Sequence, residues 1–250
     1  MNAAGHLVYS AIYGGYDEPK PLPAGLDCPA VMFTDSEDTA AAAGDLGWLP
    51  FVVRHGIATR NGNPAKTGPM LAHKYWKTHP VRALTAVGYT EDQCCLRVAL
   101  WVDGSLAIQT PDYGARCLRA LGRDDIALTP HPWRDCAIAE GEYSATLPRY
   151  RGTGVDAQTR FYADHVGHPR GWGLFASGAI AWRITGSVEE FGEYWWKECL
   201  TWSHQDQVSL PVMLRLMEKG QLPGVDQKLR WNSNLPWEQW WHLNHHAVAP

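Results

Sequence analysis

The segment 96–108 constrains the fold more than any other part of this chain. An apolar run of strand length, Leu96–Val102, stops abruptly at Asp103-Gly104-Ser105, and the sequence then becomes apolar again up to Ile108. Buried strands are near-continuous hydrophobic runs, so a carboxylate at the end of one costs free energy unless a partner compensates it. A divalent cation that carries a phosphorylated substrate would be such a partner. Because Asp-Gly is also a strong turn dipeptide, the segment alone is equally compatible with an exposed hairpin turn.

Composition is typical of a soluble globular protein. The 250 residues are 45% hydrophobic and 19% charged, and the net charge of −4 provides no basic footprint for nucleic acid. No stretch approaches the roughly 18 apolar residues of a membrane span. The N-terminal residues lack the basic and apolar regions of a secretory signal, so we expect a cytoplasmic protein.

Cysteine and tryptophan contents add two expectations. The six cysteines form no CxxC pair and no zinc-type spacing with histidine, which favours free thiols. Of the 13 tryptophans, seven lie from Trp195 onward. Aromatic rings pack against sugars, but they serve cores and interfaces equally well.

The apolar patterning alternates between strands and helices. Strands are expected at 6–13, 30–34, 48–54, 96–102 and 126–129, and 175–183 is either a strand or a buried turn. Helices are expected at 66–79, 111–121, 136–149, 153–166, 187–202 and 203–219, with Ser187 and Glu190 at capping-box spacing. This order predicts an α/β fold in which helices flank a mostly parallel sheet. We expect a single domain over 1–250, with a Trp-rich segment from about 220.

Six short motifs occur in an order that resembles a known family. In chain order they are Val8–Asp17, Phe33–Asp35, Trp101–Ser105, His131–Cys136, Gly173–Gly178 and His204–Gln207. Together they resemble the glycosyltransferase-like family once catalogued as domain of unknown function 616. The resemblance covers roughly residues 7–215 and implies a GT-A type nucleotide-sugar fold. In open α/β sheets of this kind, ligands bind at the carboxyl ends of the strands.

The resemblance implies a divalent metal, Mn²⁺ or Mg²⁺, at Asp103. Asp103-Gly104-Ser105 occupies the place of the Asp-x-Asp motif of GT-A enzymes, and alternate residues of an extended chain share a face. Gly104 would permit close backbone approach, while Ser105 is a neutral and weaker ligand than an acid. A histidine would then complete the metal shell, with His245 the preferred candidate, although tail histidines are also common on polar surfaces. The candidate histidines are His131, His242, His245 and His246.

The same resemblance implies a donor pocket near the N-terminus. Tyr9, Ala11 and Tyr13 would surround the base and ribose, and Asp35 would accept hydrogen bonds from the nucleoside unless it only caps a turn or helix. Lys74 lies on a helical face with Lys66 and Lys77 and would reach the diphosphate. The alternative for Lys66 and Lys77 is a solvated basic face.

Further donor contacts are expected from two later motifs. Arg134 offers bidentate geometry for a phosphate, but it is equally able to pair with Asp135 or Glu140 and hold its own loop. Ser177 and Gly178 would lie beneath the donor sugar, where a glycine lets ring and backbone approach.

Asp206 is the candidate acid at the acceptor end of the site. In an inverting enzyme it would be the general base that takes the hydroxyl proton, assisted by His204, and in a retaining enzyme it would orient the donor sugar. Its structural alternative is a helix N-cap.

Together these features predict a metal-dependent glycosyltransferase that uses a nucleoside diphosphate sugar, with a UDP-sugar as the expected donor. The acceptor hydroxyl would belong to a glycan, a lipid, a protein or a modified nucleic acid. Two other classes stay open: a non-catalytic carbohydrate-binding protein on the same fold, and a metal-dependent phosphoester hydrolase.

Overall fold

A seven-stranded mixed sheet forms the centre of the molecule. The computed structural model describes residues 5–54, 64–88, 97–235 and 241–243, with side chains omitted at 64–67 and 241–243. The strand order is β3-β2-β1-β4-β7-β6-β8, and β5 and β9 form a separate two-stranded sheet. The strands are β1 (His6–Ile12), β2 (Ala30–Thr34), β3 (Leu49–Val52), β4 (Val98–Val102), β5 (Leu106–Ile108), β6 (Ile126–Pro130), β7 (Phe175–Arg183), β8 (Trp231–Asn232) and β9 (Trp241–Leu243).

Most strand pairs of the large sheet are parallel. Strands β3, β2, β1 and β4 run parallel to one another, as do β6 and β8, whereas β7 is antiparallel to both β4 and β6. The predicted α/β class with a mostly parallel sheet is therefore confirmed.

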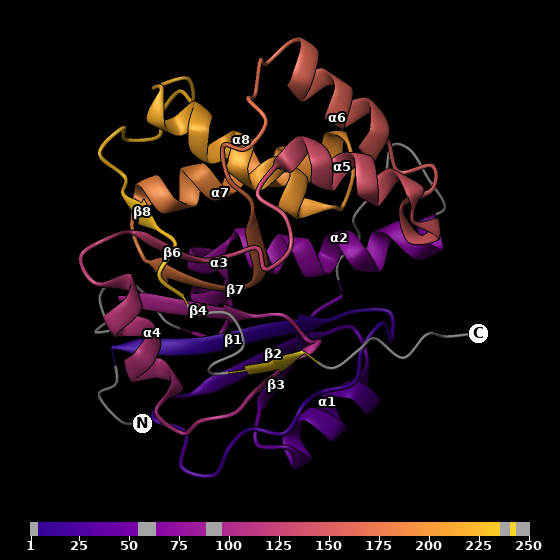
Figure 1. Ribbon diagram of the computed structural model, residues 1–250. Coiled ribbons are helices and arrows are strands. Elements are labelled where there is room, and N and C mark those ends of the chain that lie inside the picture. The colour runs from indigo at the N-terminus through magenta and orange to yellow at the C-terminus, as the bar shows by residue number, and fades with distance from the viewer. Residues whose placement is uncertain (1–4, 55–63, 89–96, 236–240, 244–250) are drawn as a thin grey trace.

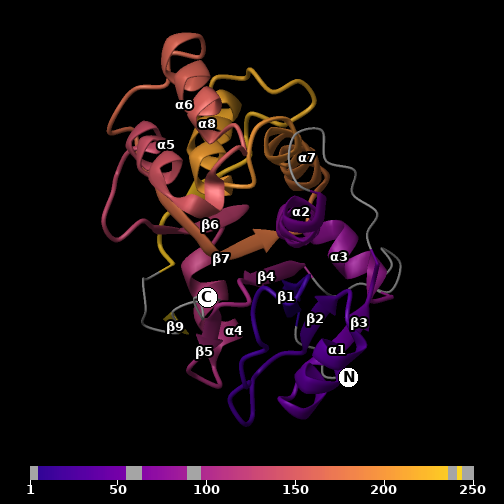
Figure 2. The ribbon, with the colours of Figure 1, turned by 90° about the vertical axis from the view of Figure 1, so that its right-hand side faces the viewer.

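Helices cover both faces of this sheet. Figures 1 and 2 show α1 and α4 on one side, with the other helices on the opposite side. The helices are α1 (Glu37–Asp45), α2 (Pro64–Thr78), α3 (Pro80–Ala86), α4 (Tyr113–Leu121), α5 (Ala137–Thr146), α6 (Val155–Asp164), α7 (Gly186–Thr201) and α8 (Asp206–Glu218), with a 3-10 turn η2 (Pro148–Tyr150).

The side chains of β1 alternate between two hydrophobic cores. Leu7, Tyr9 and Ala11 pack into the core beneath α2 and α5–α8, whereas Val8 and Ile12 face the core beneath α1 and α4. Because both faces are covered, β1 and β4 are buried along their whole length, as expected for central parallel strands.

The chain changes direction across the sheet between β1 and β4. From β1 the chain adds β2 and β3 on one side, and β4 then pairs with the free side of β1. Such a switch opens a crevice at the carboxyl ends of the two neighbouring strands, where α/β proteins generally bind ligands. Asp103 follows β4 directly at this edge.

The expected strands and helices are found within a few residues of their predicted bounds, and 175–183 is a strand. The elements α1, α3, β5, β8 and β9 were not expected. Helix α7 begins one residue earlier than predicted because Thr185, rather than Ser187, caps it by accepting from the Val188 N–H at 3.2 Å.

Two further expectations concern thiols and membranes. Cys28, Cys117, Cys136 and Cys199 are free and buried, as predicted, while Cys94 and Cys95 lie outside the described residues. In the described part of the chain, no helix combines the length and apolarity needed to cross a bilayer.

Candidate active site

Helix α2 contributes a buried lysine to the carboxyl edge of the sheet. The Lys77 side chain is 1% exposed, and its ammonium donates to Asp206 Oδ2 at 2.7 Å and to Asp103 Oδ2 at 3.3 Å. It also lies 3.4 Å from Ser177 Oγ and 5.5 Å from the centre of the Trp101 ring. A lysine is tolerated at such depth only when it is paired, and here it joins two carboxylates from distant parts of the chain.

Contacts of both its backbone and its carboxylate hold Asp103 in place. Its backbone N–H donates to the Gly178 carbonyl at 2.7 Å, which fixes the turn after β4 against β7. Ser105 Oγ lies 3.5 Å from Oδ1, and His73 Nε2 lies 3.5 Å from Oδ2. The turn places Asp103 between the sheet edge and helix α2.

Asp206 is the first residue of α8 and accepts three hydrogen bonds through its carboxylate. Lys74 Nζ donates to Oδ1 at 3.1 Å, while Lys77 Nζ and Ser177 Oγ reach Oδ2 at 2.7 and 3.0 Å. The N-cap position is occupied by Gln205, without a side-chain capping bond. The N-cap alternative for Asp206 is therefore wrong, because its carboxylate points into the cluster.

Lys74, Lys77, Asp103 and Asp206 form one ion cluster, whose two positive and two negative charges cancel. Burial alone would raise the pKa of Asp206, but the charges of Lys74 and Lys77 hold it well below its usual range. Burial would also raise the pKa of Asp103, but the effects of His73 and Lys77 outweigh it and lower that pKa. The pKa of Lys74 is raised, since Asp206 and Asp103 overcome the opposing effect of burial. At neutral pH both aspartates and Lys74 are therefore ionised.

These contacts favour a different role for Asp206 than that of the general base, which stays a prediction. A base works best with a pKa near the operating pH, whereas Asp206 is held ionised by three donors, its pKa is strongly lowered and its side chain is 3% exposed. Its geometry is that of a counter-ion that positions Lys74 and Lys77.

The cluster reaches solvent through Asp103 and Lys74. Their side chains are 16% and 12% exposed, against 3% for Asp206 and 1% for Lys77. His204 borders the same group of charges, and burial lowers the pKa of its imidazole to about 4, so it is neutral at pH 7. The exposed Arg149 adds a further positive charge near His204. The accessible rim of the cluster is therefore rich in cations, as an anionic ligand requires.

The donors around Asp103 fit a resident divalent cation poorly. Lys77 already provides a positive charge 3.3 Å from Oδ2, one of the two oxygens that a cation could bind. The described residues add only the Ser105 hydroxyl and the His73 imidazole, and a divalent cation would leave this otherwise neutral cluster with a net charge of +2. His245, the third predicted ligand, and His242 and His246 lie outside the residues whose side chains are described. Lys77 thus meets the electrostatic need that the sequence raised, and a metal at Asp103 stays a prediction.

The predicted base and ribose pocket is not formed by the side chains that were expected there. Tyr9 and Ala11 are 0% and 1% exposed and belong to the core beneath α2. The Tyr13 hydroxyl accepts from Trp76 Nε1 at 2.8 Å, also in the core. Because Tyr9 and Ala11 are almost fully buried, neither side chain is accessible to a ligand in this conformation.

Other predicted site residues have structural partners. Asp35 accepts from the Gly14 N–H at 3.0 and 3.2 Å and thereby holds the turn after β1, which is the turn-capping alternative. Arg134 pairs with the buried Glu140, its loop-holding alternative. A Cβ on Gly104 would lie 2.8 Å from Ile12 Cγ1, so this glycine is needed for packing against β1. The donor-binding roles of Asp35 and Arg134 remain predictions.

Sequence reasoning missed His73 and assigned Lys77 to the solvated face. The available signal was the spacing of His73, Lys74 and Lys77, which places all three on one side of a helix. The structure brings together the predicted residues Lys74, Asp103, Ser105, Ser177, Gly178, His204 and Asp206.

No protein-family model matches the chain, and no curated protein is significantly similar to it. Membership of the family suggested by the motifs therefore stays a prediction. Solved structures show distant likeness.

A CMP:2-keto-3-deoxy-manno-octonic acid synthetase complexed with CTP is 13% identical, with a TM-score of 0.40 over 86% of each chain. The mannosyltransferase Ktr4p from S. cerevisiae is 8% identical, with a TM-score of 0.43 over 84% of this chain and 66% of its own. The apo form of mouse xyloside xylosyltransferase 1 is 11% identical, with a TM-score of 0.40 over 87% and 82%. These values are too low to assign a function, which must come from the site itself.

Proposed function

We propose that this protein is a glycosyltransferase that moves a sugar from a nucleoside diphosphate donor to an acceptor hydroxyl. One observation carries the proposal. Lys74, Lys77, Asp103 and Asp206 form a buried ion cluster at the switch point between β1 and β4. This is the position where open α/β sheets bind ligands. The cluster is neutral by itself, so an anionic ligand would place its charge against the partly buried Lys74 and the exposed Arg149.

The lysines support the departure of a diphosphate. As the bond between sugar and phosphate breaks, negative charge develops on the leaving oxygen, and a fixed cation in a site shielded from water stabilises it. Lys74 is the cation of the pair that reaches solvent, and Asp206 holds it in place through Oδ1 at 3.1 Å. Lys77 is fixed behind it by both carboxylates. The diphosphate is proposed to bind Lys74 without displacing Lys77.

His204 is the proposed residue that orients the acceptor hydroxyl, by accepting its hydrogen bond. It is neutral at pH 7, it is more exposed than Asp206, and it borders the same cluster. A neutral imidazole has a free lone pair, whereas the carboxylate of Asp206 already accepts three hydrogen bonds.

The first experiment is calorimetric titration with UDP and other nucleoside diphosphates, in EDTA and in MnCl₂. We expect one nucleotide to bind in EDTA. Lys74→Gln should weaken its affinity about 10- to 100-fold, because a charged hydrogen bond contributes about 1.5–3 kcal/mol. Lys197→Gln removes the same charge from the exposed surface of α7 and should leave affinity unchanged.

The outcomes separate the proposed function from its alternatives. Binding with release of the nucleoside diphosphate from one nucleotide sugar supports a transferase. Binding without turnover of any nucleotide sugar indicates a carbohydrate-binding or nucleotide-binding protein, and hydrolysis of simple phosphate esters indicates a phosphoesterase. Binding that appears only with Mn²⁺ and is insensitive to Lys74→Gln would refute the role given to the lysines and favour a metal at Asp103.

A further inference from the structure

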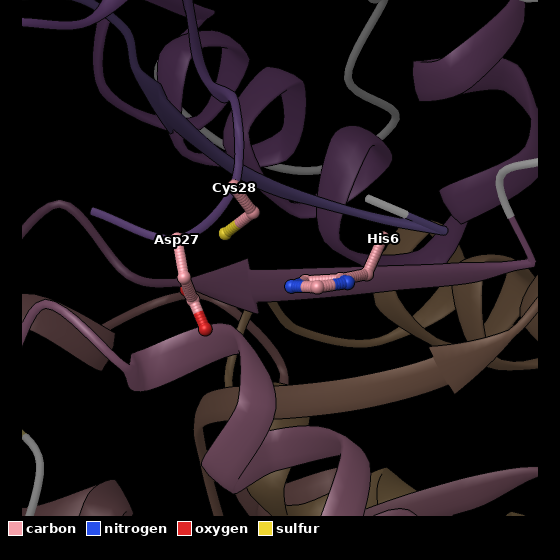
Figure 3. Close-up of side chains that lie close together, drawn as sticks. All are labelled: His6, Asp27 and Cys28. Carbon is pink, nitrogen blue, oxygen red and sulfur yellow. The ribbon is translucent and has the colours of Figure 1, made fainter. Parts of the chain in front are cut away.

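A second cluster of potential ligands lies at the opposite edge of the sheet. His6 is the first residue of β1, and Asp27 and Cys28 precede β2. One ligand atom from each residue lies within 4.8 Å of the other two. Figure 3 shows the His6 imidazole extended toward Asp27 and Cys28. Because β1 and β2 are parallel, this is their amino end, remote from the carboxyl edge that carries Asp103.

The His6 imidazole contains a buried polar atom that lacks a partner. His6 is 7% exposed, and its Nε2 makes no hydrogen bond within the described part of the chain. An unsatisfied buried polar group costs about 1–3 kcal/mol, so such an atom in a native protein requires an explanation. Burial lowers the pKa of His6, which leaves a neutral imidazole with a lone pair available to a cation.

Helix α4 keeps the histidine and the aspartate close together. The Asp27 carboxylate accepts from the Gly114 and Ala115 N–H groups at 2.9 and 2.8 Å, which fixes both of its oxygens. A Cβ on Gly114 would lie 2.2 Å from His6 Nε2 and 2.8 Å from Asp27 Oδ1. Only a glycine lets both ligand atoms approach the same point of the helix. Each carboxylate oxygen still has a lone pair for a second partner.

We propose that His6 Nε2, an Asp27 oxygen and Cys28 Sγ bind a zinc ion, with water as the fourth ligand. Nitrogen, oxygen and sulfur donors together suit Zn²⁺ rather than Mg²⁺ or Mn²⁺, which prefer oxygen alone. On binding, the Cys28 S–H bond breaks, a Zn–S bond forms, and the proton passes to solvent. The thiolate, the carboxylate and Zn²⁺ then sum to zero charge.

The zinc would join three segments that are distant in the sequence. It links the start of β1 to the loop before β2, and through Asp27 it reinforces the N-terminus of α4. Ligand atoms in a tetrahedral zinc site lie about 3.3–3.8 Å apart, given bonds of about 2.0–2.3 Å, so the three side chains need only small movements. Zinc binding is therefore expected to stabilise the folded state.

The test uses the full chain, purified in chelator and titrated with ZnCl₂ or CoCl₂. We expect one metal ion per chain, a rise in the melting temperature with Zn²⁺, and a thiolate-to-cobalt charge-transfer band with Co²⁺. Cys28→Ser should abolish this band and weaken zinc binding more than about 10-fold, since even residues that only support metal ligands contribute that much. His6→Gln should weaken binding similarly.

Cys136→Ser is the matched control, because Cys136 is equally buried, at 6% against 8% for Cys28, but lies outside this cluster. It should retain the cobalt band and the zinc affinity. The proposal is overturned if the wild-type chain gives no charge-transfer band, or if Cys28→Ser binds zinc as tightly as the wild type. The wild-type spectrum keeps the proposal testable even if a variant does not fold.

Discussion

Replacing Asp206 by asparagine tests whether this residue is the counter-ion of a buried lysine pair. The substitution keeps the shape of the side chain but removes the charge that faces Lys77 at 2.7 Å and Lys74 at 3.1 Å. Removing one partner of a buried ion pair typically costs about 3–5 kcal/mol, because the remaining charge stays buried. For a chain of this size, about 1 kcal/mol corresponds to about 2–4 °C, so the melting temperature should fall by about 6–20 °C.

The assay is urea and thermal unfolding followed by circular dichroism. Asp45→Asn, at the exposed end of α1, is the matched control and should change stability by less than about 0.5 kcal/mol. The double variant Asp206→Asn/Lys77→Met removes the stranded charge, so it should regain part of the lost stability. The counter-ion assignment is wrong if Asp206→Asn is as stable as the wild type. It is also wrong if the double variant loses as much unfolding free energy as Asp206→Asn and Lys77→Met lose together.

Two further predictions concern the pH dependence of stability and the packing of α7 against α2. The folded-state pKa values of Asp103 and Asp206 are lowered, so their contribution to stability is fully present above the unfolded value of about 3.9 and is lost as the pH falls through the folded values. Urea midpoints measured from about pH 6 down to pH 3 should fall less steeply for Asp206→Asn than for the wild type, and parallel curves would contradict this. A Cβ on Gly192 would lie 1.9 Å from the Thr78 carbonyl oxygen, so Gly192→Ala should force α7 away from α2 and cost about 1–3 kcal/mol. Gly44→Ala, in open space on α1, should instead stabilise by about 0.5–1 kcal/mol, and equal unfolding free energies for the two variants would refute the packing argument.

The repeating patterns of the sequence predicted most of the fold. Strand β4 is a continuous apolar run, β1 and β2 are mostly apolar, and α2 has clear helical spacing, so local pattern alone located them. Helix α1 was missed because its sequence is mostly Ala and acid, with little apolar periodicity. Strands β8 and β9 are two and three residues long, and tertiary pairing rather than local propensity defines them.

The candidate site was only partly predictable. A carboxylate at the end of β4 requires compensation, and this much follows from the sequence around Asp103. Its partner Lys77 lies 26 residues from Asp103 in the sequence. Lys77 also pairs with Asp206, which lies 129 residues from Lys77. A lysine in an amphipathic helix is usually solvated, so only the fold could show that Lys77 is buried between two aspartates. The same long-range pairing makes Asp206 a counter-ion of two lysines, which the sequence did not indicate.

The most direct test of the central claim is a crystal structure with UDP, or with whichever nucleoside diphosphate binds in EDTA. The account predicts a phosphate oxygen within hydrogen-bond distance of Lys74 Nζ, with the contacts of Lys77 to Asp103 and Asp206 intact. A nucleotide bound away from the carboxyl end of β4, or a diphosphate held only by a metal on Asp103 with Lys74 remote from it, would contradict the account.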